Sequence, residues 1–191
     1  CCMRMPGWRY YRFLALLLLP CLAQAGTVQT SSVDRDGDFY ALAITAQIDA
    51  PLEIVYQSIT DFDNLAAINP NIEKSRLVGR PNADTQRVHS VIKVCILMFC
   101  KRVVQVQDVT RPSEHVIEAV IVPAESDFRS GWARWQLTPR GDSTLMSFSH
   151  RFEPDFWVPP VIGPWIIKRK LVSEVAETAM YIEVRVDEQD R

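Results

Sequence analysis

The sequence has few of the residues that build catalytic and metal centres. Its 191 residues include three histidines and five cysteines, and no two histidines have the close spacing of a zinc site. A G-x-S-x-G motif, a glycine-rich phosphate loop and a C-x-x-C pair are also absent. These absences argue against a metal site, a nucleotide cofactor and a local nucleophile motif, so we expect neither a metal nor a cofactor.

Basic clusters and long apolar runs are missing as well. The 21 Lys and Arg residues are scattered and are balanced by 23 Asp and Glu, which leaves a formal net charge of −2. Strong nucleic-acid binding needs a stripe of Lys and Arg that neutralises phosphates. A membrane-spanning helix needs about 20 apolar residues. We therefore expect no nucleic-acid partner and no membrane-spanning helix.

The first 25 residues have the pattern of a secretory signal peptide. An apolar run of about ten residues over 13–22 ends before an A-x-A sequence at 23–25. Three arginines precede that run, namely Arg4, Arg9 and Arg12. We expect residues 1–25 to be removed and the protein to reach the periplasm, with an uncleaved anchor as the alternative.

Two cysteines, Cys95 and Cys100, remain after residues 1–25, and an exported protein meets an oxidising environment that favours their pairing. On one continuous strand, residues five apart point to opposite faces and cannot be bridged. In a hairpin with a four-residue loop, a common length, the cysteines face each other. We favour this disulfide-closed hairpin over the continuous strand. The tip of this hairpin is apolar and consists of Ile96, Leu97, Met98 and Phe99. We expect it to contact a membrane or a partner, or to pack at the entrance of a pocket.

The order of the expected elements predicts an α+β domain. Residues 26–37 are polar and read as a flexible leader, and 39–48 alternate as a strand. A helix over about 51–59 and a second short helix through Leu65 and Ile68 follow. The pattern then predicts six strands, at 72–79, 86–95, 100–110, 115–122, 130–138 and 143–152. A long C-terminal helix ends the domain. An antiparallel sheet of about seven strands that curls around this helix is the expected architecture.

Two segments resemble one known superfamily. IDAPLEIVYQSITDFDNLAAINPNI, at 48–72, is similar to the strand and A-P-x-x-V-[WY] helix that open START-like domains of the SRPBCC superfamily. GWARWQLTPRGDSTLMSFSHRFEPDFWVPP, at 131–160, resembles their later hairpin. The likeness is closest to the polyketide cyclase/dehydrase and coenzyme Q-binding START-like branch. It implies a helix-grip domain over 38–187 whose hydrophobic cavity binds an apolar small molecule or lipid, such as an isoprenoid quinone.

His150 is the one candidate for acid–base chemistry. It alternates with Met146, Phe148 and Phe152 on the last expected strand, so it can share an inward face with them. The alternative, which we favour, is a wall histidine or one that faces solvent. The ligand-binding candidates as a set are Trp132, Met146, Phe148, His150, Phe152, Trp157 and Trp165. We expect Trp135 to belong to the core.

Three carboxylates are weaker candidates. Glu118 interrupts an apolar strand, and an inward carboxylate there would be a functional hint. Alternation sets it opposite Ile117 and Ala119, which favours the outer surface. Asp61 and Asp63 are expected to cap and turn the helix pair rather than to catalyse.

The connection before the last helix is unusually apolar. DFWVPPVIGPWIIKRK puts Phe156, Trp157 and Trp165 around three prolines and ends in Lys168, Arg169 and Lys170. Apolar surface loops mark interaction sites, and adjacent cations suit anionic headgroups. We expect this loop either to contact a membrane or partner, or to plug the end of the fold.

Three functions fit these features. The first is a periplasmic carrier of a hydrophobic small molecule or lipid, with peripheral membrane contact. The second is an enzyme of the cyclase/dehydratase kind that uses His150 or an inward carboxylate. The third is a module whose apolar loops bind a protein. Because one fold hosts many functions, the sequence leaves all three open.

Overall fold

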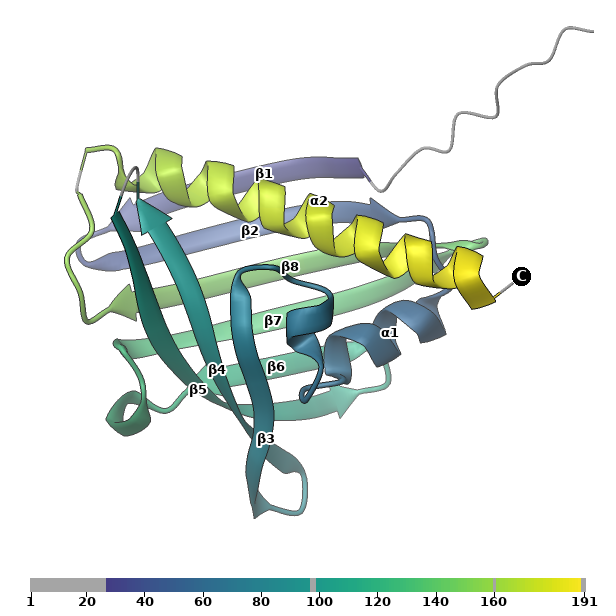
Figure 1. Cartoon of the computed structure of the whole chain (residues 1–191), viewed down its shortest axis with the longest axis horizontal. Helices are drawn as coiled ribbons and strands as arrows, with labels where there is room; N and C mark the ends of the chain where they lie inside the picture. Colours follow the sequence, from purple (N-terminus) through teal and green to yellow (C-terminus); the bar gives the residue numbers. More distant parts are fainter. Residues whose placement is uncertain (1–26, 97–98, 160, 190–191) are drawn as a thin grey trace, which may run out of the picture.

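The computed structural model describes residues 27–96, 99–159 and 161–189. It is one antiparallel sheet that wraps around a long C-terminal helix (Figure 1). The first strands and helix are β1 (Thr27–Asp36), β2 (Phe39–Ile48), α1 (Leu52–Thr60) and the 3₁₀ turn η1 (Leu65–Ala67). The middle strands are β3 (Ile72–Asn82), β4 (Thr85–Ile96), β5 (Phe99–Ser113) and β6 (Val116–Ile121). The last elements are η2 (Pro123–Glu125), β7 (Phe128–Arg140), β8 (Ser143–Pro154) and α2 (Gly163–Gln189).

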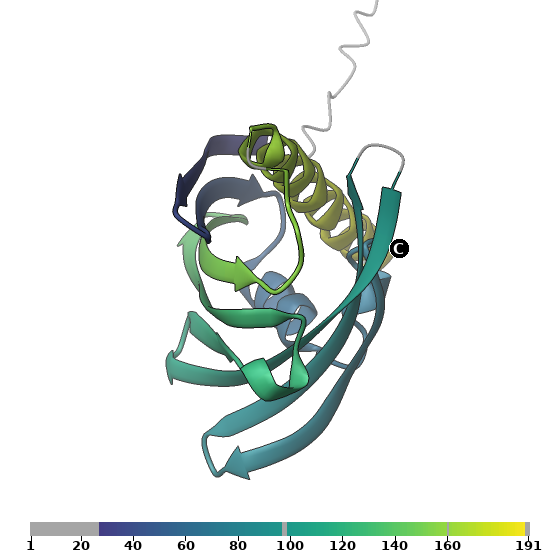
Figure 2. The ribbon, with the colours of Figure 1, turned by 90° about the vertical axis from the view of Figure 1, so that its left-hand side faces the viewer.

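The eight strands follow the order β1-β2-β8-β7-β6-β5-β4-β3, and every described pair is antiparallel. Two of the hairpins turn on a Gly-Asp pair, in which Gly37 and Gly141 have φ of 61° and 63°. Such positive φ values suit glycine and the tight turns that join twisted strands. Figure 2 shows the sheet curling, with α2 across its concave side. The predicted α+β helix-grip fold is therefore confirmed.

The structure corrects the start of the domain. The leader expected at 26–37 is wrong over most of its length, because Thr27–Asp36 forms the edge strand β1, paired with β2. Its sequence is polar because much of an edge strand faces solvent, and Val28 is one residue that packs on the core. This strand raises the number from about seven to eight. The second expected helix is also reduced to the single 3₁₀ turn at Leu65–Ala67.

The core lies beneath the C-terminal half of α2. Alternate residues of β2 are buried, and Ile48 has no exposed surface. Val55 of α1 and Ile182 of α2 belong to the same buried cluster and are equally inaccessible. Burying such a side chain contributes about 1.5–3 kcal/mol, so this cluster fixes α1 and α2 on the sheet. No helix among the described residues is long and apolar enough to cross a membrane.

Candidate functional site

A cavity of about 360 Å³ lies between the N-terminal half of α2 and the inner face of the sheet. Its wall is made mainly of apolar side chains from β4 to β8, such as Val88, Ile117 and Trp135, and is closed by Ile166 and Leu171 of α2. Its size and its few polar groups are those of a small-molecule site. The cavity therefore forms where α2 and the sheet diverge, next to the packed core.

Aromatic rings follow one another along one side of this cavity. The ring centroids of Trp135 and Phe148 are 4.8 Å apart, and those of His150 and Phe152 are 4.7 Å apart. His150 also lies 5.9 Å from Phe148, so it is held between two phenylalanines of its own strand. These residues share a face because successive strand residues alternate, as the sequence indicated for β8.

His150 is an uncharged part of the cavity wall. Its Nε2 is closed off from solvent and has no hydrogen-bond partner among the described residues. Burial lowers its pKa from 6.5 to about 4, because a charged imidazole is costly in an apolar setting. No hydrogen bond or ion pair joins it to another described side chain, so the carboxylate that often orients a catalytic histidine is not found there.

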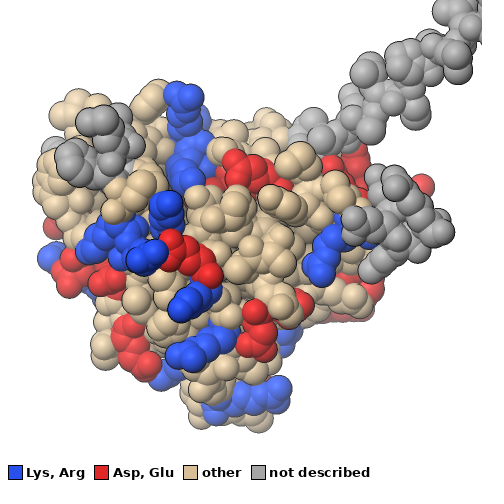
Figure 3. Space-filling model, viewed as in Figure 1, with Lys and Arg blue, Asp and Glu red and all other residues tan. Residues whose placement is uncertain are grey.

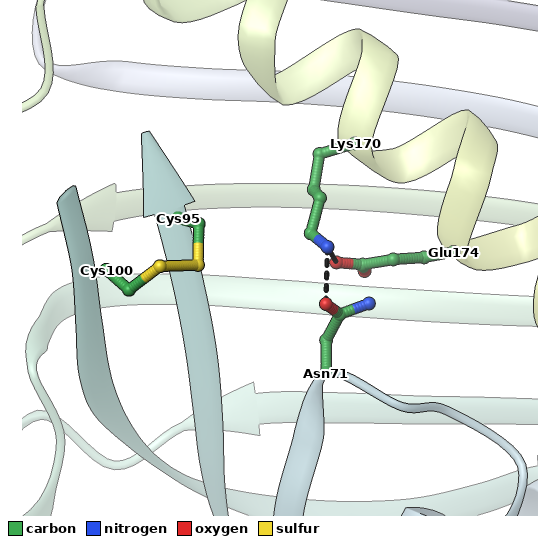
Figure 4. The surroundings of a disulfide bond; sticks show 5 residues. All are labelled: Asn71, Cys95, Cys100, Lys170 and Glu174. Carbon is green, nitrogen blue, oxygen red and sulfur yellow. Dashed lines mark hydrogen bonds and ion pairs between the residues drawn. A yellow bond between two sulfur atoms is a disulfide. The ribbon is translucent and has the colours of Figure 1, made fainter. Parts of the chain in front are cut away.

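Lys170 and Glu174, which lie beside Asn71 (Figure 4), interrupt the apolar wall of the cavity. Lys170 of α2 lines the cavity and donates a hydrogen bond from Nζ to Oδ1 of Asn71, which precedes β3. The same Nζ lies 3.8 Å from Oε1 of Glu174, one turn along the helix. Burial raises the pKa of Glu174 to about 7, while Lys170 acts in the opposite direction and Glu177 adds to the rise.

Sequence reasoning named Lys170 among the cations that follow the apolar connection, and it did not name Glu174. The available signal was a Lys–Glu pair four residues apart on a face that is otherwise apolar. Such a pair is usually a solvated surface feature. Only the position of the cavity shows that this pair borders an internal space and not open solvent. For metal binding, no group of three His, Cys, Asp or Glu among the described residues is suitably arranged.

A disulfide joins Cys95 of β4 to Cys100 of β5, with 4.0 Å between the Cα atoms. The predicted disulfide-closed hairpin is confirmed, and the continuous strand is wrong. Ile96 pairs with Phe99, so the loop is two residues shorter than expected. Leu97 and Met98 lie outside the described residues, as do the side chains of Ile96 and Phe99. Cys95 itself lines the cavity, which sets the disulfide at its edge.

Four of the seven ligand-binding candidates line the cavity, namely Met146, Phe148, His150 and Phe152. The expectation is corrected for Trp132, because Trp135 and Ala133 face inward on β7 and the alternation turns Trp132 outward. Trp132 is 45% exposed beside Val120 on the outer face. Trp135, expected in the core, packs against the buried clusters and also forms part of the cavity wall.

The connection from β8 to α2 divides between the cavity and solvent. Phe156 and Val158 line the cavity, whereas Trp157, Val161 and Ile162 are exposed. Together with the exposed Trp165 in the first turn of α2, these three residues form what we call the rim patch. Trp157 and Trp165 are 78% and 60% exposed and do not line the cavity, so their expected ligand contact is corrected.

Cations accompany the rim patch. Lys168 and Arg169 are exposed on the first turns of α2, and the guanidinium of Arg169 lies 5.5 Å from the Trp165 ring. Lys101 of β5 approaches Phe156, with Nζ 4.9 Å from the ring centroid. Elsewhere on the face drawn in Figure 3, Lys and Arg are interspersed with Asp and Glu.

The weaker carboxylate candidates have structural roles. Glu118 forms an ion pair with Arg134 on the outer face of the sheet. Asp61 accepts a hydrogen bond from Nδ2 of Asn64 at 3.0 Å, and Asp63 accepts one from the backbone N–H of Leu77 at 2.9 Å. None of these carboxylates lines the cavity.

The fold and the cavity define a helix-grip ligand-binding domain, and comparison with known proteins agrees. Residues 41–181 match the family model "Polyketide cyclase / dehydrase and lipid transport". The chain belongs to this family, within the START-like SRPBCC superfamily. No curated protein matches the chain.

Solved structures share the fold at low sequence identity. A START superfamily protein from Mycobacterium smegmatis has a TM-score of 0.61 at 21% identity, over 78% of this chain and 98% of that one. The Zhui aromatase/cyclase from Streptomyces sp. R1128 has a TM-score of 0.62 at 14% identity, over 80% and 96%. A protein from Thermus thermophilus has a TM-score of 0.60 at 20% identity, over 79% and 99%.

Proposed function

We propose that this chain binds a hydrophobic small molecule or lipid in the cavity and transports it. The observation that supports this most directly is the cavity itself, about 360 Å³ of space with a mainly apolar wall beside a buried hydrophobic core. Close packing is the rule in protein interiors, so a space of this size has a function other than stability. An isoprenoid quinone is one ligand of the required character.

Binding is favoured over catalysis by the state of His150. A general acid or base works best with a pKa near the operating pH, and burial lowers the pKa of this imidazole to about 4. The cyclase/dehydratase hypothesis remains a second candidate, because His150 lines the cavity and one relative by fold is named an aromatase/cyclase. In that case His150→Gln should abolish turnover of an offered polyketide, whereas a ligand carrier should keep its bound ligand.

Exchange of the ligand is proposed to take place at an anionic membrane surface. The rim patch is exposed next to Lys168 and Arg169, a combination that suits apolar insertion beside anionic headgroups. It also adjoins the cavity, since Val158 of the same connection and Ile166 of α2 line the cavity wall. A lipid would therefore have a short path between bilayer and cavity.

The proposed site of action is the periplasm. The signal-peptide pattern of residues 1–25 supports export. The Cys95–Cys100 disulfide is compatible with an oxidising compartment, where such bonds persist. Fractionation of cells that express the full chain tests this, and a protein found only in the cytosol would contradict it.

The binding proposal is tested by filling the cavity. Ala119 is buried and lines the cavity, whereas Ala43 is exposed on β2. Protein purified from its native compartment should release a lipid or quinone on extraction, detected by mass spectrometry. Ala119→Trp should remove that ligand, and the matched variant Ala43→Trp should retain it. Wild-type protein that is empty and takes up no offered lipid would overturn the proposal.

A further inference from the structure

The cluster of Lys170, Glu174 and Asn71 is not explained by an apolar ligand alone. Charged side chains are costly where water is excluded, yet Lys170 and Glu174 both line a cavity whose other walls are mainly apolar. Their side chains keep 38% and 23% of their exposure, so they stand where the cavity meets solvent. A ligand inside the cavity would have one end beside them.

Lys170 has hydrogen-bonding capacity to spare. An ammonium group carries three donors, and Oδ1 of Asn71 accepts one of them. Glu174 lies at 3.8 Å, beyond hydrogen-bond length. Among the described residues, the other two donors therefore have no protein acceptor. Asn71 is itself oriented, because its Nδ2 donates to Oδ1 of Asn69 at 3.3 Å and leaves Oδ1 for the lysine.

Glu174 is a weak competitor for this lysine. Its carboxyl accepts no hydrogen bond from a described residue, and burial raises its pKa to about 7. A second anion beside Lys170 would favour the neutral form of Glu174 further. A neutral carboxyl group can donate a hydrogen bond of its own. Lys170 and a neutral Glu174 can thus bind an anionic oxygen without placing a second negative charge next to it.

We propose that Lys170, oriented by Asn71 and flanked by Glu174, binds the anionic oxygens of an amphipathic ligand whose apolar chain fills the cavity. The head is a carboxylate or a phosphate, both of which accept hydrogen bonds from an ammonium group. This inference rests on the proposed binding function and narrows it to an acidic lipid. Ile167 and Leu171 line the cavity next to Lys170, so the chain begins directly below the head.

Binding of dodecanoate, dodecyl phosphate and methyl dodecanoate to the full chain tests the head-group assignment by calorimetry. Lys170→Gln should weaken the binding of both anions by about tenfold or more, which is the loss of affinity expected when a hydrogen bond to a charged group is removed. It should leave the uncharged ester unchanged. Lys74→Gln is the matched control, because it removes the same charge from an exposed position on β3 that does not line the cavity. If Lys170→Gln weakens the binding of dodecyl phosphate more, the head is a phosphate. If it weakens the binding of dodecanoate more, the head is a carboxylate.

Glu174→Gln distinguishes an anionic from a cationic head. The variant keeps the shape and a hydrogen-bond donor but removes the competing charge, so dodecanoate should bind several-fold more tightly. If dodecanoate instead binds no better and dodecylammonium binds wild type more tightly, the assignment is overturned. Equal affinity of wild type for dodecanoate and its ester would also overturn it, while leaving the carrier proposal in place. Failure of every probe to bind would overturn the carrier proposal itself.

Discussion

The two halves of α2 carry the same apolar stripe but meet different surroundings. Ala179 and Ile182, toward the C-terminus, are buried with β2 and α1 in the largest core cluster. Ile166 and Ile167, toward the N-terminus, line the cavity and are not among the residues that pack against this cluster. Figure 1 shows α2 running from the connection that follows β8 to the neighbourhood of α1. One end of the helix therefore stabilises the fold, and the other end borders the cavity.

Truncating an isoleucine at each end gives the largest expected difference. Ile182→Ala removes a side chain with no exposed surface, and such changes cost about 2–5 kcal/mol. Ile166→Ala trims a partly exposed wall that already faces empty space, so its cost should stay below about 1.5 kcal/mol. Urea unfolding of ligand-free protein measures both free energies of unfolding. Equal losses would mean that the two ends of α2 are packed alike.

The cavity also contains two ionisable groups with opposite effects of pH on stability. His150 has its pKa lowered by burial from 6.5 to about 4, so the unfolded chain binds its proton more readily. This penalty destabilises the fold as the pH falls from 6.5 to about 4. Glu174 has its pKa raised by burial from 4.5 to about 7, so the folded chain binds its proton more readily. That group stabilises the fold as the pH falls from about 7 to 4.5.

Single variants separate these two contributions. A shift of one pKa unit corresponds to about 1.4 kcal/mol. At low pH, His150 should therefore lower the free energy of unfolding by on the order of 3 kcal/mol, and Glu174 should raise it by a similar amount. Between pH 7 and 4.5, His150→Gln should lose less stability than wild type, and Glu174→Gln should lose more. Urea unfolding at the two pH values measures the difference. The same pH dependence in both variants would contradict the burial of these groups.

The sequence predicted the elements better than it predicted the site. The alternation of apolar and polar residues predicted β2 and β8 correctly, because one face of each strand points inward, toward the helices or the cavity. The same pattern did not predict β1. This strand lies at the edge of the sheet and is mostly polar, so it has no regular apolar face in the sequence. Alternation also does not say which face points inward, and this is why Trp132 was chosen where Trp135 lines the cavity.

The cavity itself was beyond sequence reasoning for a different reason. Its walls come from strands that are distant along the chain, and its volume depends on how far β4 and β5 lie from α2. The charged opening illustrates this, since Asn71 and Lys170 are 99 residues apart. A lysine and a glutamate one helical turn apart are interpreted as surface residues until the space beside them is known.

The smallest expected effect concerns the proposed membrane contact, which lies at the N-terminal end of α2. Trp157→Ser removes the most exposed aromatic side chain of the rim patch. It should weaken binding to vesicles that contain anionic lipid by about tenfold, or about 1.4 kcal/mol, because a large interfacial side chain is lost. Co-sedimentation with these vesicles measures the change.

Trp132→Ser is the matched control for this experiment. Trp132 is also exposed, but it lies on the outer face of β7, away from the cavity opening. Its loss should leave vesicle binding unchanged, and vesicles of zwitterionic lipid should bind wild type less well, because Lys168 and Arg169 then lack anionic partners. Equal losses from both tryptophans would point to nonspecific adsorption. Loss of a specific protein partner with Trp157→Ser, and no change with vesicles, would instead make the rim patch a protein-binding surface.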